Sequence, residues 1–368
     1  MAIFRQRKRT WATLIIKNPH SLKNQTKQRH FHRKVAFCSI NSMHGLCRML
    51  KVEKRKLLLL AQKPPYKIFS IPKKGGGERQ IEAPGADLKN VLRKLNTYLQ
   101  SVYYFEKSSA AYGFIVGVSN DDDRRNVITN AKKHIGNPYL LNLDLKNFFH
   151  YVTRDMVLEL FLKPPFKFKR ELPDLLADLT TYDGRLPMGT PTSPVLSNLA
   201  CRALDQELSM FADDMLWAFT RYADDMSFSS KHYINDEMIQ SVRAIIRSHG
   251  FEPNLNKEKL FDPDEQKIIT GLLVTDKVTL APGFLDQVRD DIAQLNAIVR
   301  AQNEEGQINT KWVEDRKRQI RGRLNFAGFV LKRNHPEYME LKDAFYTAIH
   351  PPQEEFHATS WRGFPYNL

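Results

Sequence analysis

Residues 219–229 of this chain carry the sequence FTRYADDMSFS. Aromatic and small polar side chains alternate on both sides of Asp224 and Asp225, and this two-residue period predicts a β-hairpin with the acids at its turn. Neighbouring carboxylates disfavour each other's ionisation, and a hard divalent cation such as Mg²⁺ removes that cost by taking their oxygens as ligands. By itself the pair fits two interpretations, a solvated turn and a metal site.

A second acidic pair in the chain serves as a comparison. Asp213 and Asp214 follow residues 196–210, where leucine and alanine recur at steps of three and four positions. That spacing predicts an amphipathic helix. We therefore expect Asp213 and Asp214 at the end of a helix, with no part in metal binding.

The composition indicates a polyanionic partner. The 368 residues include 56 Lys and Arg against 41 Asp and Glu, a net charge of +15. Nucleic acid is the usual partner for such an excess, and an anionic membrane surface is the competing one. No apolar run approaches the roughly 20 residues that span a bilayer, and the basic start is a poor signal peptide, so we expect no membrane contact. The three cysteines form no CxxC pair, which predicts reduced thiols, no zinc site and a cytoplasmic protein.

The N-terminal third combines a basic segment with a predicted hairpin. Residues 1–35 are basic with scarcely an acid, which fits either an arm on a nucleic-acid backbone or a disordered solubilising tail. Residues 66–72 and 78–84 alternate like strands around a Gly-rich turn. Cations flank this turn, as expected of a finger that folds over phosphates, although such a tip is more often simply a tight turn.

Further elements surround the acids. The apolar residues 139–145 predict a strand that carries Asp144 near its end, and residues 268–275 predict another strand. The Pro- and Gly-rich residues 186–194, LPMGTPTSP, predict a loop that holds an anion or nucleotide at a helix start. Helices are predicted over residues 40–60 (one or two), 88–104, 126–134 and 234–249, from Thr153, and beyond Pro282, with a polar surface loop over 112–125.

Together the acids indicate a chemistry. Asp144, Asp224 and Asp225 brought to one point would hold two Mg²⁺ ions, and two metals clamp the attacking and leaving oxygens of an in-line phosphoryl displacement. A hydroxyl would attack the α-phosphorus of a triphosphate, and pyrophosphate would leave.

At this point the sequence resembles the reverse transcriptases. The resemblance rests on Tyr222–Asp225, on residues 143–149 and on residues 186–194, in that family's order, and it covers roughly residues 65–330. It implies an α+β right-hand polymerase with an antiparallel palm sheet. The implied domains are a basic N-terminal helical arm (1–64), fingers (65–138), a palm with finger insertions (139–275), and a helical thumb with a C-terminal tail (276–368).

The resemblance also implies a role for each matching residue. Asp144, Asp224 and Asp225 correspond to the catalytic metal-binding triad, with the Leu145 carbonyl as an extra ligand for Mg²⁺ or Mn²⁺. The residues implied in dNTP binding are Lys73, Lys74 and Arg79 on the triphosphate, Phe149 as the gate against a ribose 2′-OH, Met188 and Gly189 beside the nucleotide, and Lys257 as the proton donor to pyrophosphate. Met188 departs from the family's usual Gln and cannot donate its amide hydrogen bond, so packing would carry more of the binding.

Two short motifs resemble those of the retron enzymes within this family. They are the sequence NAKKH at residues 130–134 and the sequence ITG at residues 269–271. The resemblance implies a cognate structured noncoding RNA as template and primer, synthesis from a guanosine 2′-OH, an RNA-linked DNA product, and antiphage defence with a separate effector protein. The residues expected to contact RNA are Asn130, His134, Thr270, Gly271, Arg318 and Arg321.

Three alternatives stay open. One is another bacterial reverse transcriptase, such as a group II intron enzyme. A second is an RNA-directed RNA polymerase or a template-independent polymerase with the same palm. The third is a noncatalytic RNA-binding scaffold, against which the complete acidic triad argues.

Overall fold

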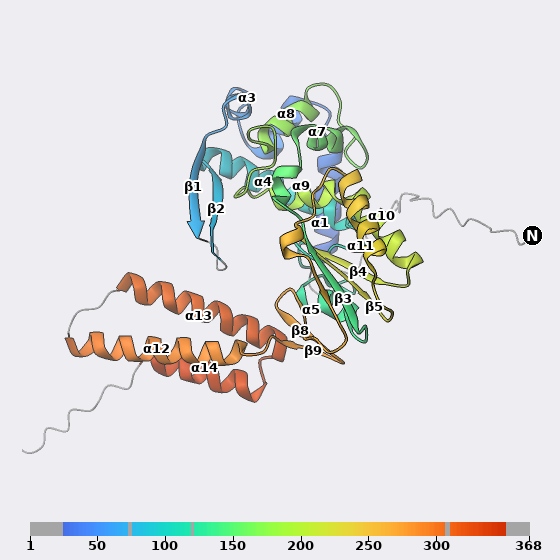
Figure 1. Cartoon of the computed structure of the whole chain (residues 1–368). Coiled ribbons are helices and arrows are strands. Elements are labelled where there is room, and N and C mark those ends of the chain that lie inside the picture. Colours follow the sequence, from blue (N-terminus) through green and yellow to red (C-terminus); the bar gives the residue numbers. More distant parts are fainter. Residues whose placement is uncertain (1–24, 73–75, 119–120, 306–309, 351–368) are drawn as a thin grey trace, which may run out of the picture. The chain divides into compact units, whose positions relative to one another are not determined.

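The computed structural model describes residues 25–72, 76–118, 121–305 and 310–350 (Figure 1). Most of the basic arm, Lys73 and Lys74, and the tail from Pro351 lie outside these residues. The chain divides into two compact units, residues 1–265 and 266–368. Helices and antiparallel sheets make up both units, so the α+β class predicted from the sequence is confirmed.

A four-stranded antiparallel sheet lies in the first unit. Its strand order is β4-β5-β3-β6, formed by Ala218–Tyr222, Asp225–Ser230, Tyr139–Asp144 and Lys259–Phe261. Because successive side chains in a strand point to opposite faces, Leu141 and Leu143 of β3 and Phe228 of β5 join the buried core on one face. Asp144 and Asp225 pair with each other on the opposite, polar face.

Helices of the first unit pack against this sheet and against one another. The helix α10 contacts β4 and α11, and α4 contacts both α1 and α9. The helices of the first unit are α1 (Gln25–Cys38), α2 (Met43–Leu50), α3 (Lys54–Gln62), α4 (Ala86–Glu106), α5 (Val127–Ala131), α6 (Phe148–Tyr151), α7 (Arg154–Leu162), α8 (Leu172–Thr180), α9 (Ser193–Ala200), α10 (Arg202–Asp214) and α11 (Asp236–Ser248), with the 3₁₀ turns η2 (Lys132–His134) and η3 (Leu255–Lys257).

Local signals explain where several of these elements begin and end. Thr153 caps α7 by accepting a hydrogen bond from the Met156 N–H, as its position in the sequence predicts. The helix predicted over residues 196–210 is in fact two, α9 and α10, which meet at Cys201, where ψ is −1°. Asp213 and Asp214 lie exposed at the end of α10, as expected.

The predicted finger is a two-stranded hairpin. Strands β1 (Tyr66–Pro72) and β2 (Glu78–Pro84) pair antiparallel, with Phe69 opposite Ile81. Most of β1 is exposed, whereas Glu82 in β2 is buried. The base of the hairpin is therefore packed against the rest of the unit, and Figure 1 shows its strands reaching away from α4.

The second unit has a small sheet and three long helices. Strands β7 (Lys267–Ile269), β8 (Leu272–Val274) and β9 (Val278–Leu280) form an antiparallel sheet, followed by α12 (Phe284–Glu305), α13 (Thr310–Leu331) and α14 (Pro336–Ile349). The strand predicted over residues 268–275 is wrong, because Thr270 and Gly271 have φ of 48° and 80° and turn the chain into the β7–β8 hairpin. None of the described helices combines the length and apolar character that a membrane span requires.

Candidate active site

The three predicted metal-binding acids lie together at one end of the four-stranded sheet. In β4 and β5 the last pair is Tyr222 with Asp225, so Ala223 and Asp224 form a two-residue turn. Asp144 ends β3 directly opposite Asp225. The Leu145 N–H donates a hydrogen bond to the Asp224 carbonyl oxygen at 3.0 Å. The predicted hairpin is confirmed, but its turn consists of Ala223 and Asp224, because Asp225 already pairs with Tyr222 as the first residue of β5. The hairpin brings together acids that are far apart in the sequence.

The carboxylates influence one another electrostatically. Burial raises the pKa of Asp225 to about 6, and the charges of Asp224 and Asp144 add to the rise. Burial and the charge of Asp144 also raise the pKa of Asp224. Within the described ranges, no three Asp, Glu, His or Cys side chains converge closely enough to hold a metal ion. The chemistry of the donor set nevertheless fits a divalent cation, which would relieve the repulsion that raises these pKa values.

Two residues from one loop contact Asp144. The Lys257 Nζ lies 3.1 Å from both carboxylate oxygens of Asp144. Asn254 donates to Asp144 twice, from Nδ2 to the carboxylate at 3.0 Å and from its backbone N–H to the carbonyl at 2.7 Å. The sequence singled out Lys257 but not Asn254, although both belong to the polar segment PNLNK, residues 253–257. The loop therefore fixes the end of β3 and brings a cation to the acids.

A buried arginine supports the turn formed by Ala223 and Asp224. Arg221 is fully buried, and its guanidinium donates to both carboxylate oxygens of Asp205, at 2.6 and 2.8 Å. The same guanidinium donates to the Ala223 carbonyl at 2.9 Å and to the Asn198 side chain at 3.1 Å. Ala223 has φ of +60°, a conformation that non-glycine residues rarely adopt. These contacts hold the turn in that conformation.

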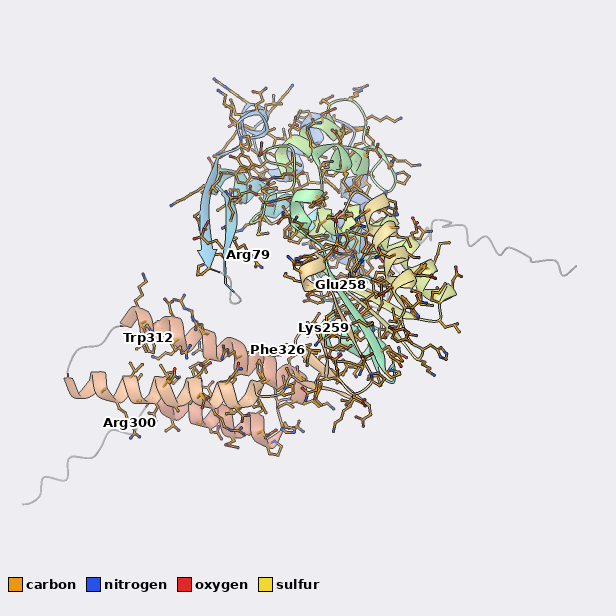
Figure 2. The ribbon with its side chains drawn as sticks, viewed as in Figure 1. Arg79, Glu258, Lys259, Arg300, Trp312 and Phe326 are labelled. Carbon is orange, nitrogen blue, oxygen red and sulfur yellow. The ribbon has the colours of Figure 1, made fainter. Side chains whose placement is uncertain are left out.

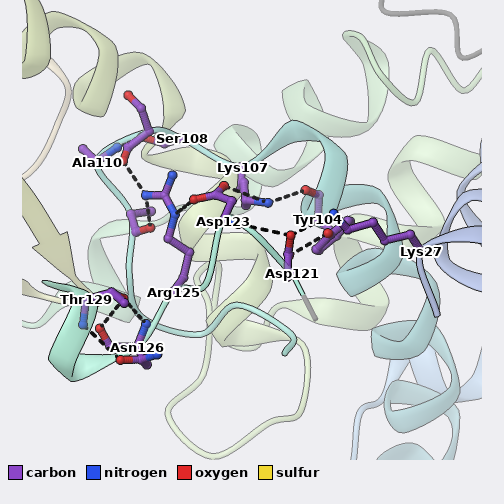
Figure 3. A network of polar contacts seen from close by, with 12 residues as sticks. Lys27, Tyr104, Lys107, Ser108, Ala110, Asp121, Asp123, Arg125, Asn126 and Thr129 are labelled. Atoms are coloured by element: carbon purple, nitrogen blue, oxygen red, sulfur yellow. Dashed lines mark hydrogen bonds and ion pairs between the residues drawn. The ribbon is translucent and has the colours of Figure 1, made fainter. Parts of the chain in front are cut away.

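The segment before this site is packed rather than a free surface loop. Asp121 accepts a hydrogen bond from the Tyr104 hydroxyl at 2.7 Å and forms an ion pair with Lys27 of α1 at 2.9 Å (Figure 3). Arg125 pairs with Asp123 and donates to the carbonyls of Ser109 and Ala111 (Figure 3).

This segment also reaches the β4–β5 hairpin. Ala111 forms a parallel bridge with Arg221, and Asn198 Nδ2 donates to the Gly113 carbonyl at 2.9 Å. A Cβ added to Gly113 would lie 2.7 Å from the Ala223 nitrogen, closer than real Cβ contacts. The loop predicted over residues 112–125 is confirmed, and Asp122, Asp123 and Arg124 are exposed. Its character as a polar surface is confirmed only in part, because long-range contacts bury Tyr112 and Asp121.

Besides Lys257, the described residues predicted to bind nucleotide lie in β2, in α6 and in the loop of residues 186–194. Arg79 is exposed on β2 (Figure 2) and lies close enough to lower the pKa of Asp224 as a minor cause. Phe149 is half-buried, with its ring centroid 5.4 Å from that of Phe148. Met188 is half-buried and Gly189 is exposed, and both lie beside β2, where Met188 exchanges hydrogen bonds with Glu82. Their nucleotide-binding roles stay predictions.

Two residues predicted to contact RNA are buried in the first unit. His134 makes hydrogen bonds to Ser229 at 2.7 Å and to Thr220 at 2.8 Å, and burial lowers its pKa to about 3. Asn130 is 1% exposed. His134 thus supports the polar face of the sheet. RNA contact by His134 and Asn130 stays a prediction.

The other predicted RNA contacts belong to the second unit. Thr270 and Gly271 form the turn between β7 and β8. Arg318 and Arg321 are exposed on α13, and Arg318 forms an ion pair with Asp315. Figure 2 shows Trp312 on the same helix. RNA contact by these four residues stays a prediction.

Comparisons with known proteins agree with this architecture. Residues 71–272 match the family described as reverse transcriptase (RNA-dependent DNA polymerase). The chain is 29% identical to the retron Ec86 reverse transcriptase of Escherichia coli over 69% of this chain and 78% of the relative. It is 30% identical to the retron Mx65 reverse transcriptase of Myxococcus xanthus over 59% of this chain and 52% of the relative.

Solved structures include two similar chains. A foamy viral protease–reverse transcriptase in complex with double-stranded DNA is 17% identical, with a TM-score of 0.41 over 80% of this chain and 42% of that one. Telomerase from Candida albicans with a fragment of telomeric RNA is 11% identical, with a TM-score of 0.40 over 79% and 64%.

The family match covers more than half of the 368 residues and includes the strands and the turn that carry the three acids. The right-hand polymerase fold and the RNA-directed DNA polymerase activity predicted from the sequence are confirmed at the level of this family. The chain belongs to the reverse transcriptase (RNA-dependent DNA polymerase) family.

Proposed function

We propose that this chain is a retron-type RNA-directed DNA polymerase. It copies a cognate structured noncoding RNA, starting from the 2′-OH of a guanosine in that RNA, and leaves a single-stranded DNA joined to RNA. The polymerase chemistry rests on one observation, the pairing of Asp144 with Asp225 beside the Asp224 turn. The retron assignment is supported by relatives that are themselves retron reverse transcriptases and by the motifs at residues 130–134 and 269–271.

The acids would hold two divalent ions, Mg²⁺ or Mn²⁺. Asp144, Asp224 and Asp225 would be the ligands, with the Leu145 carbonyl as a further one. When bound, such ions stabilise the charge that develops on the attacking and leaving oxygens of an in-line displacement at phosphorus. The protein's own part is to fix the three carboxylates before the substrate arrives, on two strand ends and a supported turn.

The surrounding side chains would select and orient the dNTP. Arg79 binds the triphosphate, an assignment supported by its exposure and its electrostatic influence on Asp224. Phe149 blocks a ribose 2′-OH, and the apolar Met188 side chain packs against the nucleotide where an amide would otherwise donate a hydrogen bond. Lys257 protonates the departing pyrophosphate, which fits its ammonium 3.1 Å from Asp144. Lys73 and Lys74 complete the triphosphate contacts.

The rest of the chain would hold the nucleic acid. The net charge of +15 suits a template RNA and its DNA product. We retain the division into an arm (1–64), fingers (65–138), palm (139–275) and thumb (276–368), with RNA contacts from the arm and thumb. Cytoplasmic location and a separate effector protein in antiphage defence belong to the same proposal.

The proposal is tested by expressing the chain together with its flanking genomic noncoding region and recovering the nucleic acid bound to it. Separate digestion with RNase and DNase then distinguishes the products. A discrete short DNA joined to RNA is the expected result. Bound RNA without DNA, combined with synthesis on a supplied primer–template, would leave a polymerase of another type. RNA binding without synthesis under any condition would leave the noncatalytic scaffold.

The two acidic pairs supply matched variants. Changing both Asp224→Asn and Asp225→Asn should abolish synthesis while RNA binding persists. Changing both Asp213→Asn and Asp214→Asn, at the exposed end of α10, should preserve synthesis. Unchanged synthesis in the first variant would exclude the metal assignment.

A further inference from the structure

A carboxylate is buried at the base of the exposed β1–β2 hairpin. Glu82 is 1% exposed, although the residues before it in β2, from Glu78 to Gln80, are all exposed. Burying an ionised carboxylate is costly unless charged or hydrogen-bonding groups surround it. The partners of Glu82 therefore indicate what its burial achieves.

Glu82 is bonded to the loop of residues 186–194 and to its flank. The Arg185 guanidinium donates to both carboxylate oxygens, at 3.1 and 2.9 Å. The Met188 N–H donates to the same carboxylate at 2.9 Å, and the Glu82 N–H donates to the Met188 carbonyl at 2.7 Å. Burial raises the pKa of Glu82, but the hydrogen bonds from Arg185 and Met188 outweigh it, so the pKa is lowered and the group is ionised.

The backbones of Gly189 and Glu82 lie too close together to admit a side chain at residue 189. Gly189 has φ of +137°, and a Cβ added there would lie 2.9 Å from the Glu82 carbonyl oxygen and 3.1 Å from Ile81. Strand β2 and the loop thus meet through backbone at Met188 and Gly189. Movement of one segment would carry the other with it.

A third segment meets the same carboxylate. His150 Nε2 lies 3.4 Å from a Glu82 oxygen, and it has no hydrogen-bond partner among the described residues. His150 directly follows Phe149 in the short helix α6. The carboxylate therefore contacts or adjoins the strand that carries Arg79, the loop that carries Met188 and Gly189, and the helix that carries Phe149.

From these contacts we infer that Glu82 is the positioning residue of the nucleotide site. It fixes Arg79, the Met188–Gly189 backbone and Phe149 in one relative arrangement, and so sets dNTP affinity and sugar selection without touching the substrate. The inference rests on the nucleotide-binding roles proposed above. It also explains how the loop can function with Met188 in place of an amide, because Glu82 bonds the backbone of residue 188 and not its side chain.

The inference requires the negative charge of Glu82, and not only its shape, to hold the nucleotide site in this arrangement. In Glu82→Gln the side chain keeps its size, but an NH₂ group replaces one carboxylate oxygen. This group donates hydrogen bonds, so it would face the N–H donors of Arg185 or Met188 without an acceptor between them. Hydrogen bonds to charged groups contribute more than neutral ones, so loss of this arrangement should raise the KM for dNTP about tenfold or more. The preference for dNTP over rNTP should fall, and kcat should change less than KM.

The test measures steady-state dNTP and rNTP incorporation on a supplied primer–template by the full chain and its variants. Arg185→Lys keeps the positive charge but loses the paired geometry, and it should raise the dNTP KM in the same direction. Glu106→Gln is the matched control, because Glu106 also bridges two cations, Lys34 at 2.6 Å and Arg202 at 3.3 Å, outside the nucleotide-binding set. It should leave KM and sugar preference unchanged.

The outcomes separate this inference from the proposed function. The inference would be overturned if Glu82→Gln and Arg185→Lys both left the dNTP KM and the sugar preference unchanged while thermal unfolding showed that both variants are folded. The polymerase assignment would then stay intact. A fall in kcat and Tm with no change in KM or sugar preference would assign Glu82 a merely structural role and overturn it as well. Absence of synthesis by the unmodified chain would instead refute the proposed function.

Discussion

Arg221 and Asp205 form a doubly hydrogen-bonded ion pair in which neither side chain is exposed to solvent. The pair lies next to the Ala223–Asp224 turn, because the same guanidinium donates a hydrogen bond to the Ala223 carbonyl. Burial of both charges is costly, and their attraction with complete hydrogen bonding offsets that cost. Removing one partner leaves the other charge buried and alone.

Asp205→Asn is therefore expected to lower the free energy of unfolding by about 3–5 kcal/mol and to reduce synthesis. Chemical denaturation at neutral pH measures the first effect, and primer extension measures the second. Lys163→Gln is the control, because Lys163 and Glu159 form an exposed pair at the C-terminal end of α7. For this substitution we expect a change of under about 1 kcal/mol. Equal effects of the two substitutions would contradict a supporting role for the buried pair.

Gly113 is expected to tolerate no side chain. In Gly113→Ala the new Cβ would lie 2.7 Å from the Ala223 nitrogen, so the Ala223–Asp224 turn must shift. We expect a loss of about 1–3 kcal/mol in stability, as for other overpacked sites, and a larger proportional loss of kcat. Gly117→Ala is the control, since an added Cβ there meets no described atom within 4 Å. Primer extension with wild-type kcat in Gly113→Ala would disprove the close contact.

The repulsion among the acids should make the metal-free protein less stable as pH rises. The pKa of Asp225 is about 6 in the folded chain, above the ordinary value of 3.8, so the folded state holds this proton more tightly. The penalty is small below pH 4, grows between about pH 4 and 6, and is complete above. Neighbouring groups desolvate the Asp225 carboxyl group, but the residue as a whole keeps contact with solvent, so screening should limit the penalty to about 1 kcal/mol.

Asp225→Asn should accordingly raise Tm in EDTA at pH 7.5 and have little effect at pH 4. Mg²⁺ should stabilise the unmodified chain more than this variant. Thermal unfolding across that pH range, with Asp213→Asn as the control, provides the measurement. A Tm increase that is largest at pH 4 would contradict the assigned direction.

His134 should make the protein sensitive to acid in the opposite sense. Burial lowers its pKa to about 3 from the ordinary 6.5, so below pH 6.5 the unfolded chain takes a proton that the folded chain excludes. The contribution of neutral His134 to the free energy of unfolding is fully present above pH 6.5. It is lost as pH falls toward 3, and about 2 kcal/mol is lost by pH 5. His134→Gln should remove that difference between pH 7.5 and 5 in denaturation experiments, whereas His44→Gln at an exposed position should not.

The alternation of side chains along the sequence predicted the hairpin that carries Asp224 and Asp225. Alternating serines in residues 226–230 place their hydroxyls on the polar face of β5, and the two-residue period predicted the hairpin correctly. The Thr270–Gly271 turn was missed, because the apolar residues on both sides resemble one continuous strand when the positive φ values are unknown.

Partners distant in the sequence could not be predicted in this way. Nothing in the spacing distinguishes the buried Arg221 from the many exposed cations, since its burial depends on Asp205 in a different element. Glu82 likewise lies in a strand whose other charged residues are exposed, and its partners lie in a loop far along the chain. Such contacts are set by tertiary packing, which periodicity does not record.

The gate assigned to Phe149 gives the sharpest test of substrate class. Replacing a half-buried aromatic ring by a methyl group opens space where a ribose 2′-OH would lie, so Phe149→Ala should increase rNTP incorporation relative to dNTP by about ten- to hundredfold. Phe105→Ala is the control, because Phe105 is also half-buried and packs against aromatic rings, those of Phe31 and Tyr104, in the N-terminal part of the unit. It should change stability but not sugar preference. Competition between dNTP and rNTP in primer extension measures both variants. Unchanged selection in Phe149→Ala would mean that the ring only packs, and sugar discrimination would then have to come from another side chain.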